Sequence, residues 1–210
     1  MSWQRPQDWP VIEGIVTTLS TDEAEGADAP GRGANLAPMG PIVAPDFSEM
    51  VLRPFAGSTT LANLQAHGEA VFHVTDDAAL IARGVIGSAR PGENVQVQPA
   101  REIDGMVVKD ACRVLELKVR NLDDSTERSV IEADVVADYT LRPFVGFNRA
   151  RHAVLEAAIL ASRVHLTGVK ATLDEMAPFQ VWVDKTGTDA ERAAMVELRE
   201  YVEGTGETPG

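Results

Sequence analysis

Residues 32–63 read RGANLAPMGPIVAPDFSEMVLRPFAGSTTLAN, a stretch that joins two strand-like segments to the start of a helix. Its first segment, 35–41, is interrupted by Pro38 and Gly40. Proline cannot donate a hydrogen bond to a neighbouring strand, and glycine readily adopts turn conformations. We therefore expect a strand over 34–43 that breaks at Pro38 and turns at Gly40.

The second half of this stretch predicts a place for an anion at the start of a helix. A short strand at 50–53 ends in Arg53, and Ser58, Thr59 and Thr60 follow where a helix begins. A helix start presents unpaired backbone N–H groups and the positive end of the helix dipole, which suit a phosphate. The alternative is that Ser58 or Thr59 only caps a short helix. On the pattern alone the cap is favoured, because caps are common and bound phosphates are rare.

Composition and charge exclude several classes of function. The 210 residues carry a net charge of −13, which is unsuited to nucleic acid or to an anionic membrane surface. No apolar run approaches the roughly 20 residues of a membrane-spanning helix. Residues 1–10 have no apolar signal-peptide core, so we expect a cytoplasmic protein. The single cysteine, Cys112, is interpreted as a buried thiol and not as a nucleophile.

Periodicity and turn residues predict the other strands and helices. A polar turn at 121–127 between two long strands indicates a hairpin. The acidic, glycine-rich segment 21–33 is typical of a surface loop, 90–110 has no clear pattern, and 204–210 should fray. The expected strands are 11–19, 34–43, 50–53, 69–74, 112–122 and 128–140, and the expected helices are 58–67, 78–83, 148–164 and 189–202, with further helical material after 166.

The helix expected at 148–164 is apolar over most of its circumference, which indicates a buried helix. A narrow polar stripe runs along it and points either to solvent or into a pocket. Sequence alone leaves both possibilities open. The stripe consists of Arg149, His152, Glu156 and Arg163.

One hexapeptide occurs twice. Leu-Arg-Pro-Phe-Ala-Gly at 52–57 is followed by Leu-Arg-Pro-Phe-Val-Gly at 141–146, and nothing else in the two halves repeats. Each copy follows a strand and precedes a helix start, so each places an arginine near a helix N-terminus. If both helix starts face one cleft, they would form an anion site from two sides.

Three motifs resemble a known family. Asn-x-Ala-Pro-Met-Gly at 35–40, followed by Ser-Thr-Thr-x-x-Asn-Leu at 58–64, resembles the flavin reductase-like FMN-binding split barrels. With Phe-x-Gly-Phe-Asn-Arg-Ala-Arg-His-Ala-Val-x-Glu-Ala-Ala at 144–158, nearly the whole chain resembles one branch of them, DUF447. The resemblance implies a fold that is mainly β with α: an FMN-binding split β-barrel of six or seven strands at 1–140. A helical C-terminal region at 141–210 would pack on the barrel, and the protein would form a homodimer.

The resemblance also implies roles for individual residues. In such barrels the flavin ring lies near the Asn-x-Ala-Pro strand, and hydroxyls and basic residues after the next strand hold the phosphate. Apart from the resemblance, the start of the long helix carries cations, which are electrostatically unfavourable there and so favour a second anionic group, either an anionic substrate or the same phosphate reached across a dimer interface. The alternative is plain surface charge at a helix start. The phosphate ligands expected are Arg53, Ser58, Thr59 and Thr60, the ring ligands are Asn35, Ala37 and Met39, mainly through their backbone, and the residues for a second anionic group are Arg149, Arg151 and His152.

These assignments predict an FMN-dependent oxidoreductase that passes hydride or electrons from a donor to a small-molecule acceptor. No residue is marked as a catalytic acid or base. The alternative is a non-catalytic flavin-binding, ligand-binding or interaction protein on the same scaffold. The chain has no glycine-rich dinucleotide or phosphate loop, no nucleophile elbow, and no histidine spacing typical of a metal site.

Overall fold

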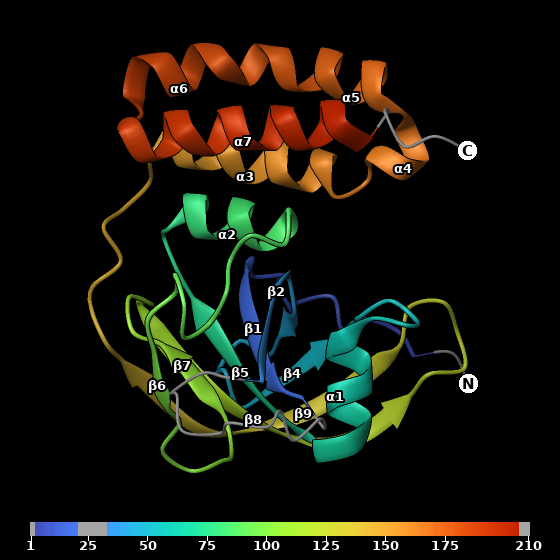
Figure 1. The fold of residues 1–210 in the computed structure, drawn as a ribbon. Coiled ribbons are helices and arrows are strands. Elements are labelled where there is room, and N and C mark those ends of the chain that lie inside the picture. Colours follow the sequence, from blue (N-terminus) through green and yellow to red (C-terminus); the bar gives the residue numbers. More distant parts are fainter. Residues whose placement is uncertain (1–2, 21–32, 206–210) are drawn as a thin grey trace. The chain divides into compact units, whose positions relative to one another are not determined.

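The computed structural model describes residues 3–20 and 33–205. Within it the chain forms two compact units, Met1–Thr75 with Arg90–Pro143, and Asp76–Ala89 with Phe144–Gly210 (Figure 1). The second unit thus takes a segment from the middle of the chain as well as the C-terminal part. The predicted division of the chain after residue 140 stays a prediction.

The first unit is built on a seven-stranded antiparallel sheet that curls into a half-barrel (Figure 1). Its strands run in the order β2-β1-β5-β8-β9-β4-β3, and a separate two-stranded sheet pairs β6 with β7. The strands are β1 Gly14–Leu19, β2 Ala34–Met39, β3 Ile42–Val43, β4 Glu49–Leu52, β5 Glu69–Val74, β6 Val97–Pro99, β7 Met106–Val108, β8 Arg113–Asp123 and β9 Val130–Thr140. This confirms the predicted split barrel with a helical C-terminal region.

The core of the first unit is apolar and is formed by residues of this sheet and of the helix that packs on it. Helix α1, Thr59–His67, packs against β1 and β2 and adds Leu61 and Leu64 to that core. Burying one such side chain contributes about 1.5–3 kcal/mol, so this anchors the helix firmly. The fully buried residues around them include Val16, Met50, Leu52, Phe72, Leu115, Leu117 and Ile131.

The predicted bent strand 34–43 is divided in two. β2 ends at Met39 and β3 begins at Ile42. A Cβ on Gly40 would lie 2.7 Å from side-chain atoms of Glu13 and Val11, so these side chains would have to shift to admit a larger residue at this corner. The first strand begins at Gly14 and not at residue 11, although Val11 makes an isolated bridge to Ile42.

Two other stretches differ from, or go beyond, the sequence prediction. The segment 90–110, which had no clear pattern, contains the short pair β6–β7. The loop expected at 21–33 lies outside the described residues except for Gly33. At the other end, Gly204 and Thr205 still belong to a helix, and the rest of the expected frayed tail is outside the described part.

The second unit is all helical, with α3 at its centre. α3 contacts α2, α5, α6 and α7 through a face of alanines that allows close approach (Figure 1). The predicted helix 148–164 ends at Ala161, and a separate short helix follows. The helices are α2 Ala78–Val85, α3 Arg149–Ala161, α4 Val164–Thr167, α5 Val169–Met176, the 3-10 turn η1 Ala177–Phe179, α6 Gln180–Thr186 and α7 Asp189–Thr205.

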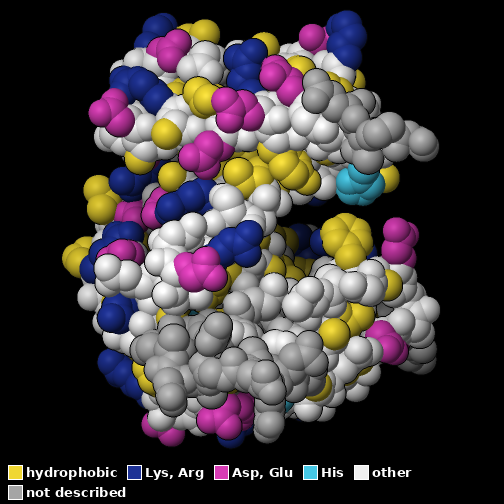
Figure 2. Space-filling model, viewed as in Figure 1, with side chains coloured by type: hydrophobic (Ala, Val, Ile, Leu, Met, Phe, Trp, Pro, Cys, Tyr) yellow, Lys and Arg dark blue, Asp and Glu magenta, His cyan; other side chains and the backbone are white. Residues whose placement is uncertain are grey.

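The surface of the second unit is mixed in charge. In the view of Figure 2, acidic and basic side chains are interspersed over the helices at the top. Of the helices in residues 3–20 and 33–205, none is long and apolar enough to span a membrane.

Candidate functional site

The residues expected to contact a flavin ring lie on β2 at one edge of the sheet. Among the described strands, β2 pairs only with β1, and Asn35, Ala37 and Met39 lie opposite Thr18, Val16 and Gly14. Being two residues apart, the three side chains share one face of the strand. All three are half-buried.

The register of β1 and β2 decides which backbone groups point to the open edge. Ser20 N–H donates to Gly33 O at 2.7 Å, and hydrogen-bonded pairs recur every second residue in an antiparallel ladder. The backbone groups of Asn35, Ala37 and Met39 therefore point toward β1. The backbone N–H and C=O of Leu36 and the C=O of Pro38 point away from β1, to the open edge. An edge position suits Pro38, because proline has no N–H to donate to a neighbouring strand.

A polar network connects this strand to the start of α1. Asn35 Nδ2 donates to Thr60 Oγ1 at 3.0 Å, so the ring segment and the phosphate segment meet although they are 25 residues apart. Thr18 Oγ1 accepts from Asn35 Nδ2 at 3.5 Å and from Asn63 Nδ2 at 2.9 Å. Thr18, Thr60 and Asn63 are buried.

The start of α1 has the geometry of a capped helix. Ser58 is the N-cap and accepts from Leu61 N at 3.3 Å, so the capping interpretation is correct for this residue. Thr59 is exposed and Thr60 is buried. The backbone N–H groups of Thr59 and Thr60 belong to the first helical turn, where no intrahelical acceptor exists. The cap and an anion at the same helix start are compatible.

Arg53 directly follows β4 and lies just before this helix start. Its side chain is half-buried, and within the described part of the chain its buried Nε has no hydrogen-bond partner. Buried polar groups are nearly always paired, so such an atom requires an explanation. The turn that follows Arg53 is held against residues 127–129 by two backbone hydrogen bonds. Ala56 N–H donates to Glu127 O at 2.9 Å, and Ser129 N–H donates to Pro54 O at 3.1 Å.

The residues expected for a second anionic group begin α3, in the other unit. Asn148 caps this helix, accepting from Ala150 N at 2.8 Å and from Arg151 N at 3.2 Å. Arg149 and His152 are exposed, as are Glu156 and Arg163 of the predicted polar stripe. The His152 ring lies 5.8 Å from the ring of Phe147.

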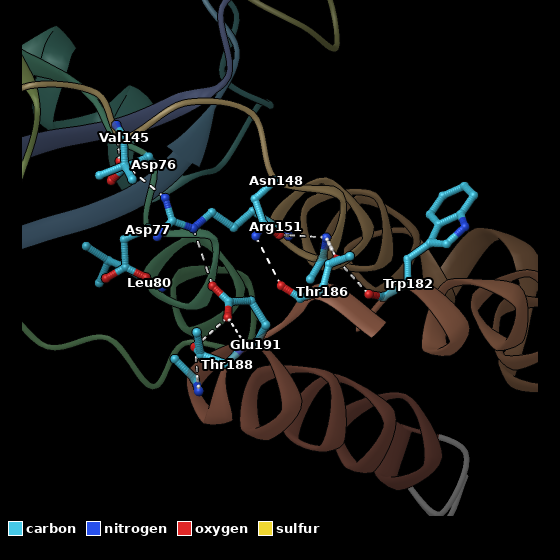
Figure 3. Close-up of polar contacts among 12 residues, drawn as sticks. Asp76, Asp77, Leu80, Val145, Asn148, Arg151, Trp182, Thr186, Thr188 and Glu191 are labelled. Carbon is cyan, nitrogen blue, oxygen red and sulfur yellow. Dashed lines mark hydrogen bonds and ion pairs between the residues drawn. The ribbon is translucent and has the colours of Figure 1, made fainter. Parts of the chain in front are cut away.

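Arg151 is held by carboxylates of its own unit (Figure 3). Its Nη1 lies 3.3 Å from Asp76 Oδ2, and its Nε lies 3.4 Å from Glu191 Oε1. Both carboxylates are nearly buried, with 3% and 7% of their side chains exposed. They offset the unfavourable position of a cation at a helix start, which gives Arg151 a structural reason to be there.

Two buried polar residues of the first unit were not anticipated. Glu116 accepts from Arg101 N at 2.8 Å, Glu102 N at 2.7 Å and Tyr139 Oη at 2.8 Å, so it fixes the 100–105 loop to β8. Burial, and then the hydrogen bond to Glu116, raise the pKa of Tyr139. In sequence Glu116 is an ordinary polar member of an alternating strand, so no signal distinguished it.

His73 is the second of these residues. Its Nδ1 lies 3.1 Å from Ile15 O, and its Nε2 accepts from Val108 N at 3.1 Å, so the ring is neutral. Burial lowers the pKa of His73 to about 4, although the bond to Ile15 O acts in the opposite direction. Within residues 3–20 and 33–205, no three His, Cys, Asp or Glu side chains are grouped to hold a metal ion.

Comparison with solved structures found one with the same fold over nearly the whole chain. An FMN-bound DUF447 protein from Methanosarcina mazei is 24% identical, with 92% of this chain and 95% of that chain aligned and a TM-score of 0.74. Nitrilotriacetate monooxygenase component B from Bacillus cereus is 21% identical over 64% and 71% of the two chains, with a TM-score of 0.49. 2-Nitrobenzoate 2-nitroreductase from Pseudomonas fluorescens is also 21% identical. The alignment covers 62% of this chain and 65% of that chain, with a TM-score of 0.48.

Comparison with protein families covers most of the sequence. No curated protein matches the chain. A family model described as "Protein of unknown function (DUF447) N-terminal domain" matches residues 12–142, and one described as "Protein of unknown function (DUF447)" matches residues 148–200. The chain therefore belongs to the DUF447 family.

Proposed function

We propose that the protein binds FMN in its first unit and passes hydride or electrons through it to a small-molecule acceptor. The observation that carries this proposal is the hydrogen bond between Asn35 and Thr60, at 3.0 Å. It brings together the strand expected to hold the ring and the helix start expected to hold the phosphate. A nucleotide that carries both groups could then reach both.

The phosphate end of the site fits a dianion. The first turn of α1 offers backbone N–H groups and the positive end of the helix dipole. Thr59 is exposed there, and Arg53 has a buried Nε without a partner among the described residues. Ser58 caps the helix, so its role would be to hold the helix start in place. Thr60 is buried and would act through Asn35.

The ring end of the site fits a flat heterocycle. The outward backbone groups of Leu36 and Pro38 lie on an edge strand and offer a donor and two acceptors along a line. The Asn35, Ala37 and Met39 side chains lie on the adjoining face. Bound flavin would supply the redox chemistry, and these residues would orient it and limit its contact with water.

Similarity to a known protein supports the cofactor. The Methanosarcina mazei protein of the same fold is described as FMN-bound. We extend the cofactor to this chain because the local features above are present in its own residues. A homodimer, a cytoplasmic location and a second anionic group near Arg149, Arg151 and His152 belong to the same proposal.

The first test is whether the phosphate residues hold FMN. In the double variant Arg53→Ala with Thr59→Ala, the Kd for FMN should rise about 100-fold, because charge-assisted hydrogen bonds are lost. Titration of the apoprotein, followed by flavin fluorescence, measures this. Arg199→Ala with Thr205→Ala removes the same two residue types from exposed positions of α7 and is the matched control. Equal FMN affinity in the two double variants would refute the phosphate site.

A second measurement separates an enzyme from a flavin carrier. Under anaerobic conditions, a reduced nicotinamide or deazaflavin donor should bleach the visible flavin band of the purified protein. Retention of the band with every donor would favour the alternative, a non-catalytic flavin-binding protein.

A further inference from the structure

Four polar side chains inside the first unit are joined in one hydrogen-bond network. Asn35 Nδ2 donates to Thr60 Oγ1 at 3.0 Å and to Thr18 Oγ1 at 3.5 Å, and Asn63 Nδ2 donates to the same Thr18 oxygen at 2.9 Å. Thr18, Thr60 and Asn63 are only 3%, 3% and 4% exposed. The network therefore joins β1, β2 and α1 where water cannot replace its bonds.

The carboxamide of Asn35 is turned with its NH₂ group toward two hydroxyl oxygens. Its NH₂ group has two hydrogens, and both are directed to hydroxyl oxygens, of Thr60 and Thr18. Because the carboxamide is planar, Oδ1 then points away from both hydroxyls. Within the described residues no hydrogen bond to Asn35 Oδ1 is made, and the side chain is half-buried at the sheet edge. Asn35 thus presents an acceptor and not a donor.

We propose that Asn35 Oδ1 accepts a hydrogen bond from a ring N–H of the bound cofactor, and that Thr18 is the positioning residue that holds it in that orientation. This inference rests on the proposed FMN site. Oxidised flavin has one ring N–H, the imide at N3, so the acceptor selects ligands with an imide donor. Heterocycles without that hydrogen bind more weakly, because Oδ1 is then left without a donor.

Thr18 is essential to this arrangement because the last torsion of asparagine is soft and nearly two-fold. Without the Thr18 oxygen, one amide hydrogen of Asn35 loses its acceptor, and the group can rotate to present NH₂ instead of Oδ1. Asn63, buried and donating to the same oxygen, keeps Thr18 in place. Thr17, next to it on β1, points to the other face and donates to Met106 O at 2.5 Å.

The test compares the Kd for FMN with the Kd for N3-methyl FMN, which lacks the imide hydrogen. Wild-type protein should bind FMN at least about tenfold more tightly, the effect of one lost hydrogen bond with an unpaired partner. Thr18→Ser should keep this ratio, whereas Thr18→Val and Asn35→Ala should lower it to about threefold or less. Thr17→Val removes a buried hydroxyl from the other face of the same strand and should keep the wild-type ratio.

The outcomes are distinct. An unchanged ratio in Thr18→Val, with both flavins still bound, would overturn the positioning role of Thr18. A wild-type protein that binds both flavins equally would overturn the role of Asn35. Binding of neither flavin by wild-type protein would refute the proposed function itself. If Thr18→Val binds both flavins more weakly but keeps the wild-type ratio of the two Kd values, Thr18 supports only the fold.

Discussion

At the scale of single residues, His73 shows how one buried side chain makes stability depend on pH. It joins β5 to β1 through Ile15 O and to β7 through Val108 N–H. Only the neutral ring can donate at one nitrogen and accept at the other, and its pKa is lowered to about 4. Protonation would place an N–H against the N–H of Val108.

The direction of the pH effect follows from that pKa. Between the ordinary value near 6.5 and about 4, the unfolded chain binds a proton at His73 and the folded chain does not. Stability therefore falls as the pH drops through this window, by about 3 kcal/mol for this one group. Above pH 7 both states are neutral, and the group contributes no pH dependence.

We therefore expect the stability difference between wild type and His73→Gln to shrink by about 3 kcal/mol from pH 7 to pH 4. Glutamine keeps one donor and one acceptor but does not titrate. Urea unfolding at several pH values measures this difference, and carboxylates common to both proteins cancel. A constant difference, or an NMR titration that places the His73 pKa near 6.5, would contradict the prediction.

At the scale of elements, the second unit depends on ion pairs that join helices distant in sequence. Arg151 on α3 reaches Asp76, just before α2, and Glu191 in the first turn of α7 (Figure 3). Asp76 Oδ2 also accepts from Val145 N at 2.9 Å. Burial alone would raise the pKa of Glu191, but hydrogen bonds, first from Thr188, lower it overall.

Removing Arg151 would leave two nearly buried carboxylates without their cation. We expect Arg151→Ala to lower the stability of the protein by about 2 kcal/mol, less than for a fully buried pair because Arg151 is partly exposed. Arg149→Ala, at the same helix start but exposed, should change stability by no more than about 0.5 kcal/mol. Chemical denaturation followed by circular dichroism compares them. Equal effects of the two changes would show that the ion pairs contribute nothing.

The same two variants test the second anion site. If Arg149 and His152 bind an anionic group, Arg149→Ala should weaken ligand binding without weakening the fold. Arg151→Ala can weaken ligand binding only because part of the variant is unfolded. If binding is normal in conditions where the variant is fully folded, Arg151 has a structural role alone.

At the scale of the whole molecule, ligand binding should stabilise one unit directly. Trp3 and Trp9 pack in the first unit, and Trp182 lies in the second, so replacing either group by Phe leaves fluorescence that reports on one unit. With FMN at 100 times its Kd, the unfolding free energy reported by Trp3 and Trp9 should rise by about 2.7 kcal/mol. Riboflavin, which lacks the phosphate, should give a smaller shift at the same concentration. No shift despite bound FMN would contradict binding to the first unit.

The sequence by itself determined most strands, most helices and the family, because these follow from local periodicity, turn residues and the motif at 35–64. It also located the turn at Gly40 and the cap at Ser58, since both are properties of a few adjacent residues, although the expected break at Pro38 comes only after Met39. The short strands β6 and β7 were not predicted from the sequence, because three residues are too few to show the alternation of a strand.

Only the tertiary structure decided which polar groups face which. The pairing of β1 with β2 turned the backbone of Leu36 and Pro38 outward, where sequence had named Asn35, Ala37 and Met39. It also joined Asn35 to Thr18 and Thr60, and gave Arg151 two carboxylates as partners. Partners of this kind lie 17 to 75 residues apart in the chain, so no local pattern records them. Register and burial, which are set by packing, give each of these polar atoms its role.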